Sequence, residues 1–279
     1  MEAGRPDLTQ LGRYRVDALI GRGAMGVVYR GLDPSTGRIV ALKTLALARE
    51  FNGEALTEAR ARFARESDTA ARLQHPGIVS VIESGEDQGL AFIAMEFVVG
   101  HSLAEHTTAG HLLTSAQVAA LGARVADALD HAHRQGVVHR DIKPANVLVD
   151  PALAIVKVAD FGIARITDAA RTRTGLMLGT PSFMSPEQMA GGRIDGRSDI
   201  YSLGVRLYQL LTGALPHASE SMARLMYAIV NEPAPDVRGL RPELPEALAR
   251  IVAQALEKRA DRRPADAGQM AAELRAVNC

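Results

Sequence analysis

The hydrophobic pattern of this chain changes about a third of the way along it. Before residue 97, short runs of β-branched and aromatic residues are separated by glycines and turn formers, a pattern typical of strands. From about residue 112, apolar residues recur at helical spacing instead. The change predicts an α+β fold with a β-rich lobe over 1–97 and a larger, mainly helical lobe over 98–279. The strands expected in the first lobe are 14–20, 27–32, 39–43, 78–84 and 90–97, with 85–89 as the loop of the last hairpin and one helix at about 54–73.

Composition excludes several classes of protein. Lysine plus arginine and aspartate plus glutamate number 32 each in 279 residues, and this zero net charge argues against a nucleic-acid-binding protein. The single cysteine, Cys279, rules out a disulfide framework and a cysteine-based zinc site, and fits a reducing compartment. The first residues show no signal-peptide pattern, and no apolar run is long enough to span a bilayer. We therefore expect a cytoplasmic location and no membrane span in this chain.

Gly21, Gly23 and Gly26 form a G-x-G-x-x-G motif. Glycines at this spacing let the backbone approach a phosphate closely and point N–H groups at it. A dinucleotide-binding fold would need a helix directly after the motif, but the strand formers Val27 and Val28 follow instead. We therefore expect a glycine-rich hairpin, and a flexible turn without a ligand remains the alternative.

Lys43 and Glu66 are candidates for an ion pair. Lys43 shares one face of its strand with Ile39 and Ala41, because side chains alternate along a strand. Glu66 falls within the apolar stripe of the expected helix at about 54–73. An unpaired buried carboxylate is costly, so Glu66 needs a partner, and Lys43 on a neighbouring strand is the obvious candidate. The alternative is that Glu66 lies at the edge of the stripe and faces water.

Segment 139–146, with the sequence His-Arg-Asp-Ile-Lys-Pro-Ala-Asn, carries the most specific motif. It lies between an expected helix and a short expected strand. From such a loop, Asp141, Lys143 and Asn146 can supply a carboxylate for a substrate hydroxyl proton, a cation for a phosphoryl group and an amide oxygen for a metal. A polar loop rich in turn formers would account for Pro144 and Asn146, but not for the whole octet.

Asp160-Phe161-Gly162 follows another expected strand, 155–158. A carboxylate at the end of a strand, beside a flexible glycine, suits a hard cation such as Mg²⁺. Alone, the tripeptide more often marks a turn. The separation between Asn146 and Asp160, however, leaves room for one β-hairpin. Such a hairpin would bring Asp160 close to Asn146, which favours Asp160 as a second metal ligand.

Taken in order, the four motifs resemble those of protein kinases of the serine/threonine class, and the match is to the eukaryotic-like kinases found in bacteria. The resemblance runs from Leu11 to about Val277. It implies a bilobal protein kinase fold and transfer of the ATP γ-phosphate to serine or threonine hydroxyls of proteins. It also implies ATP and Mg²⁺ as cofactors, with Mn²⁺ as an alternative metal.

The resemblance assigns roles to the residues of the second lobe. Asp141 would be the catalytic base and Lys143 the lysine typical of the serine/threonine class. Asn146 and Asp160 would be the metal ligands. Thr180 would form a hydrogen bond with Asp141 and Lys143 that helps to select a hydroxyl acceptor.

The nucleotide would be held mainly by residues of the first lobe. The resemblance implies that Lys43 holds the α- and β-phosphates with Glu66 as its partner, and that the glycine-rich loop covers the phosphates. The chain from Met95 to Val98 would bind adenine through backbone groups, between apolar side chains. The residues expected to bind ATP are Ile20, Gly21, Arg22, Gly23, Ala24, Met25, Gly26, Val27, Val28, Ala41, Lys43, Met95, Glu96, Val98, Leu148 and Asp160.

Further positions match structural features of the family. Glu187, in a segment that resembles the Ala-Pro-Glu motif, should pair with Arg263, and Asp199 should brace the catalytic loop. Arg206 departs from the family pattern, because it stands where the family usually has an apolar residue. We expect this arginine to lower stability locally and to have no catalytic role.

The segment between Asp160 and Glu187 is rich in threonine and arginine. The resemblance implies autophosphorylation at Thr172 and Thr174, with Arg140 as the partner of a phosphothreonine. For any single threonine, a solvated residue without a role is the alternative. The implied partners are protein substrates with serine or threonine acceptors and, for autophosphorylation, a second copy of the chain in a homodimer.

Two other functions remain open. A pseudokinase of the same fold would lack one of the lysine, aspartate and asparagine residues named above, and all of them are present. A small-molecule phosphotransferase of related fold would seldom combine Lys143 with a segment such as 180–187, which shapes a peptide groove. The chain ends after its last expected helix, so we expect either a soluble kinase or the cytoplasmic domain of a longer membrane-tethered kinase.

Overall fold

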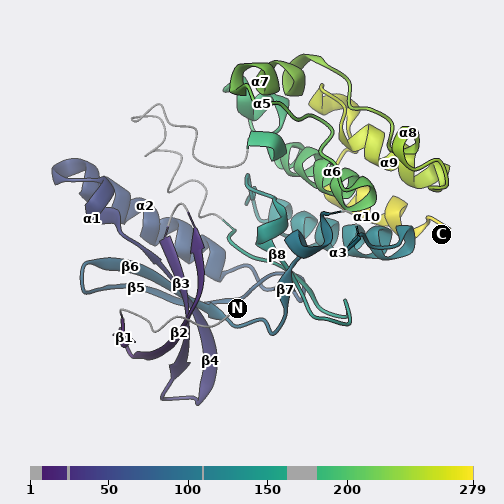
Figure 1. Ribbon diagram of the computed structural model, residues 1–279. Coiled ribbons are helices and arrows are strands. Elements are labelled where there is room, and N and C mark those ends of the chain that lie inside the picture. The colour runs from purple at the N-terminus through teal and green to yellow at the C-terminus, as the bar shows by residue number, and fades with distance from the viewer. Residues whose placement is uncertain (1–7, 24–25, 109, 162–180, 279) are drawn as a thin grey trace. The chain divides into compact units, whose positions relative to one another are not determined.

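The computed structural model describes residues 8–23, 26–108, 110–161 and 181–278 (Figure 1). The chain forms two compact units. The first comprises residues up to Gln74, Val79–Val98 and Phe161, and the second comprises His75–Ile78, Val99–Asp160 and the described residues from 181 onward. The α+β class expected from the sequence is confirmed, since strands dominate the first unit and helices the second.

A six-stranded antiparallel sheet forms most of the first unit, in the order β1-β2-β3-β4-β6-β5 (Figure 1). Its strands follow one another along the chain except at the end, where β6 lies between β4 and β5. Asp33 ends β3, and Gly37, with φ of 70°, lies in the turn directly before β4. The strand bounds are β1 Gln10–Leu11, β2 Tyr14–Gly23, β3 Gly26–Asp33, β4 Arg38–Leu45, β5 Val81–Asp87 and β6 Leu90–Glu96.

The last hairpin of this sheet differs from the sequence-based prediction. The strand expected at 78–84 is displaced to β5, and the loop expected at 85–89 shrinks to two residues. Both loop residues have positive φ, 51° at Gln88 and 74° at Gly89, which suits a tight turn whose twist matches that of the strands. Ile78 does not pair in this sheet but forms a bridge with Val158 in the second unit.

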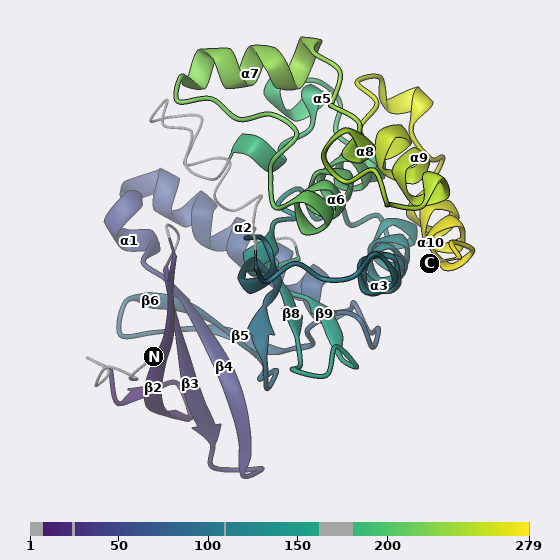
Figure 2. The ribbon, with the colours of Figure 1, turned by 45° about the vertical axis from the view of Figure 1, so that its right-hand side comes forward.

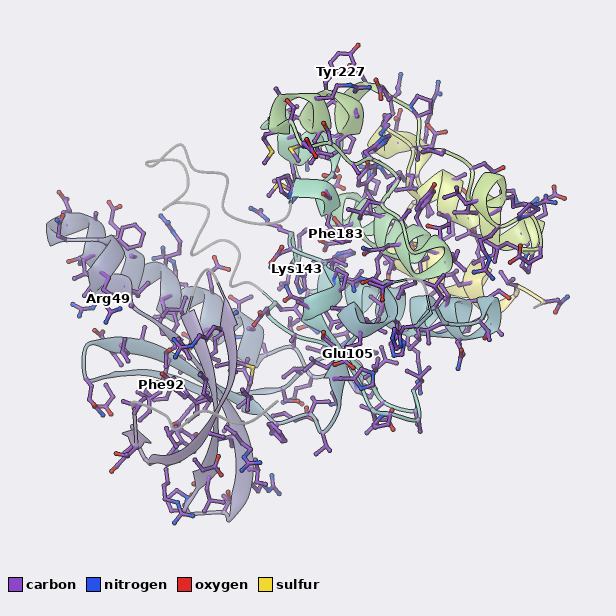
Figure 3. All side chains as sticks on the ribbon, viewed as in Figure 1. Arg49, Phe92, Glu105, Lys143, Phe183 and Tyr227 are labelled. Carbon is purple, nitrogen blue, oxygen red and sulfur yellow. The ribbon has the colours of Figure 1, made fainter. Side chains whose placement is uncertain are left out.

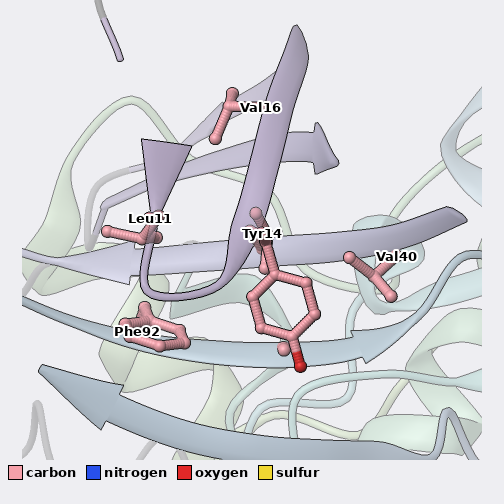
Figure 4. Packing of buried hydrophobic residues seen from close by; sticks show 7 residues of the cluster. Leu11, Tyr14, Val16, Val40 and Phe92 are labelled. Atoms are coloured by element: carbon pink, nitrogen blue, oxygen red, sulfur yellow. The ribbon is translucent and has the colours of Figure 1, made fainter. Parts of the chain in front are cut away.

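One face of the sheet carries an apolar cluster (Figure 4). The rings of Tyr14 and Phe92 meet edge to face, with centroids 6.4 Å apart. Alternate residues of β4, Val40 and Leu42, point to this same face, as the period-2 pattern of a strand requires. The buried members are Leu11, Tyr14, Val16, Val40, Leu42, Phe92 and Ala94.

Two helices accompany the sheet in the first unit, the short α1, Leu47–Glu50, and α2, Gly53–Ala71. The second agrees with the helix expected at about 54–73. Its buried positions, among them Phe63 and Ala70, recur at steps of three and four, which confirms the apolar stripe.

Helices form most of the second unit (Figure 2). Within it, α3 packs against α6 and α10, and α6 packs against α9. Val118, Leu121, Val125 and Leu129 recur at helical spacing in α3, and all four are buried. Thr114 starts that helix with a capping box, in which its hydroxyl accepts from the Gln117 N–H. The helix bounds are α3 Ser115–Arg134, α5 Pro186–Met189, α6 Gly196–Thr212, α7 Met222–Asn231, α8 Val237–Leu240, α9 Glu246–Ala255 and α10 Ala267–Arg275.

A small antiparallel sheet completes the second unit, in the order β7-β8-β9. Its strands are β7 His101–Ser102, β8 Val147–Val149 and β9 Val156–Val158. The hairpin of β8 and β9 confirms the spacing argument made from Asn146 to Asp160. Over the described parts of the chain, no helix is both long and apolar enough to cross a membrane.

Candidate active site

The glycine motif lies at the junction of β2 and β3. Gly23 pairs with Gly26 at the end of the antiparallel ladder, which confirms the expected hairpin. Gly26 has φ of 152°, and a Cβ built on it would lie 1.8 Å from the carbonyl oxygen of Thr44, so a side chain does not fit there. Ala24 and Met25, which were expected to bind the nucleotide, lie outside the described residues.

The second face of the first sheet gathers the residues expected to bind the nucleotide. In an antiparallel pair, directly opposite residues point to the same side. Lys43 on β4 lies opposite Val28 on β3. Ala41, two residues before Lys43, lies opposite Met95 on β6. These four side chains therefore share one face, and the apolar cluster of the alternate residues, such as Leu42, occupies the other.

The last residue of β6, Glu96, is bonded to the chain before β5. The Glu96 N–H donates to the Ser80 carbonyl at 2.9 Å, and the Ser80 N–H donates to Glu96 Oε2 at 3.4 Å. Among the other residues expected to bind the nucleotide, Ile20 is 46% exposed, which is high for an isoleucine. In the glycine-rich hairpin, Gly21 and Val27 are half-buried and Arg22 is exposed. Val98, after β6, and Leu148, on β8 of the second unit, are both half-buried.

Glu66 lies on α2 between the buried residues Phe63 and Ser67. Both Glu66 and Lys43 are half-buried and belong to the first unit. This placement agrees with the stripe position that the sequence indicated for Glu66. The ion pair between the two side chains stays a prediction.

The catalytic-loop candidate is organised around the carboxylate of Asp141 (Figure 3 labels Lys143). Lys143 Nζ donates to Asp141 Oδ2 at 2.6 Å. Asn146 Nδ2 donates to the same oxygen at 3.2 Å and to the Asp141 carbonyl at 2.9 Å. The loop thus brings the three residues together, as the motif predicted, and both side-chain donors converge on one carboxylate oxygen.

His139 anchors the loop from within. Its side chain is fully buried, with Nε2 2.8 Å from the carbonyl oxygen of Ala159, so Nε2 carries the proton and donates it to that oxygen. Nδ1 then accepts from the Asp141 N–H at 3.2 Å. The imidazole therefore ties the backbone of the catalytic-loop candidate to the end of β9.

Asp199 on α6 fastens the start of the same loop. Its carboxylate is fully buried and accepts the N–H groups of His139 and Arg140, each at 2.8 Å. These bonds hold the backbone directly before Asp141 and hold Arg140 at a φ of 68°, which is unusual for a residue with a side chain. The bracing role that the resemblance implied for Asp199 agrees with this geometry.

Two residues of this region escaped the reasoning from sequence. His133, near the end of α3, places Nε2 2.7 Å from Asp199 Oδ2. Gln188 donates from Nε2 to the Arg140 carbonyl at 2.9 Å, while its Oε1 accepts from Ser185 in a capping box. The Ser-x-x-Gln spacing was a visible signal for the second residue. Nothing in the sequence distinguishes His133 from the neighbouring histidine, His131.

Asn146 and Asp160 are the residues expected from the sequence to hold a hard cation. Because Asn146 Nδ2 is occupied by Asp141, its amide oxygen points away from those bonds. The Ala159 N–H donates to the Asn146 carbonyl at 2.9 Å. This bond brings the backbone directly before Asp160 next to the backbone of Asn146. An amide oxygen and a carboxylate are of the ligand types that suit Mg²⁺. Within the described ranges, three or more His, Cys, Asp or Glu residues nowhere form a group that could hold a metal.

A buried ion pair joins Glu187 on α5 to Arg263, which follows α9. Arg263 donates from Nη1 and Nη2 to the two carboxylate oxygens of Glu187, both at 2.8 Å. Ser198 Oγ adds a third hydrogen bond to Glu187 at 2.5 Å. Although burial alone would raise the pKa of the Glu187 carboxyl, the bonds from Arg263 and Ser198 hold it below its ordinary value. The pairing expected between Glu187 and Arg263 is confirmed.

Thr180, Thr172 and Thr174 lie outside the described residues.

The matches to known proteins of similar sequence extend over nearly the whole of this chain but over only part of each relative. The serine/threonine-protein kinase pkn3 of Myxococcus xanthus is 42% identical over 95% of this chain and 50% of its own length. The DNA damage-responsive serine/threonine-protein kinase RqkA of Deinococcus radiodurans is 40% identical over 95% of this chain and 40% of its own length. The chain thus spans half or less of the length of these two relatives.

A solved structure and a family model extend the comparison to the fold. The crystal structure of the PknI kinase domain from Mycobacterium tuberculosis matches with a TM-score of 0.74 and 31% identity, over 95% of this chain and 96% of that one. The family model described as the protein kinase domain matches residues 14–274. The chain therefore belongs to the protein kinase family, as a domain of the eukaryotic-like type found in bacterial serine/threonine kinases.

Proposed function

We propose that this chain transfers the γ-phosphoryl group of ATP to serine and threonine hydroxyls of proteins. Protein kinases as a family use ATP and a divalent metal. The observation that carries the proposal is the arrangement around Asp141, whose Oδ2 accepts from both Lys143 and Asn146. Two donors fix the carboxylate in one orientation, as a general base at a defined position requires.

The chemistry follows from these residues. Asp141 accepts the proton of the acceptor hydroxyl while that oxygen bonds to the γ-phosphorus. The bond from the γ-phosphorus to the bridging oxygen breaks, and ADP leaves with the electron pair. Lys143, already held beside Asp141, donates to the transferred group and offsets its charge. Asn146 and Asp160 would hold Mg²⁺, or Mn²⁺ as the alternative metal, and the ion would neutralise charge on the phosphate oxygens.

A single assay separates this proposal from its rivals. The chain is incubated with labelled ATP, Mg²⁺ and a generic basic protein that offers serine and threonine. We expect phosphoserine and phosphothreonine in the acceptor. A pseudokinase would bind nucleotide without transferring phosphate, and a small-molecule phosphotransferase would leave the protein unlabelled.

Asp160→Asn should weaken binding of ATP in the presence of Mg²⁺ by at least about tenfold, because a charged ligand of a hard cation is lost. Asp160 has φ of 68°, and asparagine is among the residues that tolerate this conformation best, so the backbone should be retained. Calorimetric titrations with and without Mg²⁺ measure the effect. Equal loss of affinity in both titrations would show that the carboxylate acts on the nucleotide and not on the metal.

Lys43→Arg should leave the protein folded with little kinase activity. The positive charge is kept, but a planar guanidinium differs from an ammonium in shape and reach, so it would not fit between Glu66 and the phosphates. Activity is measured at saturating ATP, and thermal unfolding checks the fold. A variant that retains most of the parent rate would remove the proposed Lys43–Glu66 pair.

We also propose that the chain phosphorylates itself in trans on Thr172 and Thr174, through a transient homodimer. The support is Arg140, whose backbone N–H and carbonyl are held by Asp199 and Gln188. Its guanidinium can bind a phosphothreonine through two parallel hydrogen bonds. Such a contact would connect the phosphothreonine to the catalytic-loop candidate. The chain would act in the cytoplasm, where ATP is available.

In the Thr172→Ala/Thr174→Ala variant, phosphate should be absent from the segment and activity should fall several-fold. Mass spectrometry after incubation with ATP measures the modification, with Asp141→Asn as the inactive control. The regulatory proposal fails if the active parent carries no phosphate on either threonine, or if the double variant is fully active.

A further inference from the structure

Two histidines of the second unit place their ring nitrogens against each other. Nε2 of His101 lies 3.1 Å from Nε2 of His106, and the centroids of the two rings are 5.3 Å apart. Both side chains are half-buried, so solvent and small ions reach them. Imidazole is the commonest metal ligand among side chains. Neither histidine belongs to the candidate active site or to the residues expected to bind ATP.

The local fold brings the two rings together. His101 begins β7 and lies opposite Val149 of β8 in the small sheet. The 3₁₀ helix η1, Leu103–His106, follows directly, and the hydroxyl of Ser102 caps it by accepting the Ala104 N–H at 3.4 Å. Leu103 is 1% exposed and fixes the start of η1 in the core. The turn of η1 then returns the chain, so that the His106 ring meets the His101 ring.

The hydrogen bonds of His106 determine which of its nitrogens carries a proton. Nδ1 lies 3.0 Å from the carbonyl oxygen of His111, which can only accept, so Nδ1 carries the proton and donates it. Nε2 of the neutral ring is then unprotonated and accepts from Nε2 of His101. Histidines that bind metals show the same arrangement, because a carbonyl that holds one ring nitrogen orients the lone pair of the other. His106 is therefore preorganised as a ligand.

The separation of the two Nε2 atoms also suits a metal. Imidazole nitrogens lie about 2.0–2.1 Å from zinc, so two of them at tetrahedral or right angles are about 2.8–3.4 Å apart. The separation of 3.1 Å between His101 and His106 falls within this interval. Both nitrogens can bind one ion after a tilt of the rings, without movement of the backbone.

A second histidine pair in the same unit lacks this geometry. The rings of His75 and His131 have centroids 5.0 Å apart and planes tilted by 33°. Nδ1 of His75 accepts from the Gly77 N–H at 3.0 Å, and Nε2 of His131 accepts from the Gln135 amide at 2.7 Å. These nitrogens are bonded to other groups and not to each other. The chain thus contains an internal control for the pair at His101 and His106.

We propose that His101 and His106 form a binding site for a transition-metal ion such as Zn²⁺, Ni²⁺ or Cu²⁺. Imidazole suits these ions, whereas Mg²⁺ prefers oxygen ligands, so the site differs from the one proposed at Asn146 and Asp160. Among the residues that the structure describes, no group of three His, Cys, Asp or Glu forms, so water would complete the coordination. Glu105, exposed beside His106 on η1, adds a negative charge that attracts a cation (Figure 3).

Binding exchanges the hydrogen bond between the two rings for two bonds to the metal. The proton on Nε2 of His101 leaves to solvent and Nδ1 of that ring takes one up, so the ring stays neutral and offers the Nε2 lone pair. His106 keeps its proton on Nδ1, bonded to the His111 carbonyl. Metal binding therefore changes the tautomer of one histidine only.

Calorimetric titration with Zn²⁺ tests the proposal, with excess Mg²⁺ present and Cys279 replaced by serine to remove a competing thiol. We expect one ion to bind per chain. In His101→Gln and in His106→Gln the affinity should fall at least about tenfold, since even the loss of a group that orients a ligand costs that much. His131→Gln is the matched control and should bind as the parent does. Unchanged affinity in His101→Gln, or an equal loss in His131→Gln, would overturn the proposal.

NMR of the histidine side-chain nitrogens supplies a measurement that is independent of kinase activity. Without metal, Nε2 of His101 and Nδ1 of His106 should carry the protons. Saturating Zn²⁺ should move the proton of His101 to Nδ1 and leave that of His106 in place. Unchanged tautomers of both rings at saturating Zn²⁺ would refute the site, whatever the outcome of the phosphoryl-transfer assay.

Discussion

Asp141→Asn should lower the rate of phosphoryl transfer by about two to four orders of magnitude, the usual contribution of a positioned acid–base group. The geometry sharpens this expectation. Lys143 and Asn146 both donate to Oδ2 of Asp141. In the variant the amide oxygen must occupy that position to accept these bonds. The amide NH₂ group then replaces Oδ1, so a donor faces the acceptor hydroxyl in place of a proton acceptor.

Nucleotide binding should be nearly unchanged in this variant, because Asp141 is not among the residues proposed to bind ATP or metal. Single-turnover kinetics measure the transfer step and calorimetry measures the affinity for ATP with Mg²⁺. Asp68→Asn is the control, since Asp68 is an exposed carboxylate on α2, and it should match the parent in both. Equal transfer rates in Asp141→Asn and the parent would remove Asp141 from the role of base.

The candidate site was predictable where its residues are close in sequence. Asp141, Lys143 and Asn146 lie within six positions, and a loop of that length can bring their side chains together whatever the surrounding fold. The pair of Glu187 and Arg263 joins distant segments, and only the resemblance to a family could predict it. The faces of the first sheet were also predictable, because strand alternation places Ala41 and Lys43 together.

Other features depend on tertiary contacts that no local pattern encodes. The hairpin turn at Gln88 and Gly89 requires two positive φ angles, and the five polar and glycine residues at 85–89 fit several loop lengths equally well. The selection of His133 rather than His131 as a partner of Asp199 depends on which side of α3 packs against α6. For Arg206, the sequence indicated an unusual residue, but only the fold showed that its side chain is completely buried.

Arg263→Met should destabilise the protein by about 3–5 kcal/mol at pH 7, the usual cost of removing one partner of a buried ion pair. The Arg263 side chain is 0% exposed and that of Glu187 is 16% exposed, so water cannot replace the lost bonds fully. The substitution also removes the donor to the carbonyl groups of Arg197, Glu257 and Lys258. Urea unfolding at constant pH measures the loss.

The pH dependence distinguishes a lost ion pair from lost packing. In the parent, the pKa of Glu187 lies below its ordinary value of 4.5, so its stabilising contribution is complete above that pH and disappears as the pH falls through the lowered value. Arg263→Met removes the main hydrogen bonds that lower the pKa of Glu187. Burial, which acts in the opposite direction, should then raise that pKa. Stability of the variant should then increase as the pH falls toward 4, and the difference between variant and parent should shrink.

Arg259→Met provides a matched control in the same segment. Arg259 pairs with Asp261 at 2.7 Å, but their side chains are 68% and 57% exposed. Because exposed ion pairs contribute little, this variant should unfold at nearly the same urea concentration as the parent, at pH 7 as at pH 4. A cost for Arg263→Met that stays the same at both pH values would assign the loss to packing of the arginine stem, and the ion pair with Glu187 would then contribute nothing to the stability of the second unit.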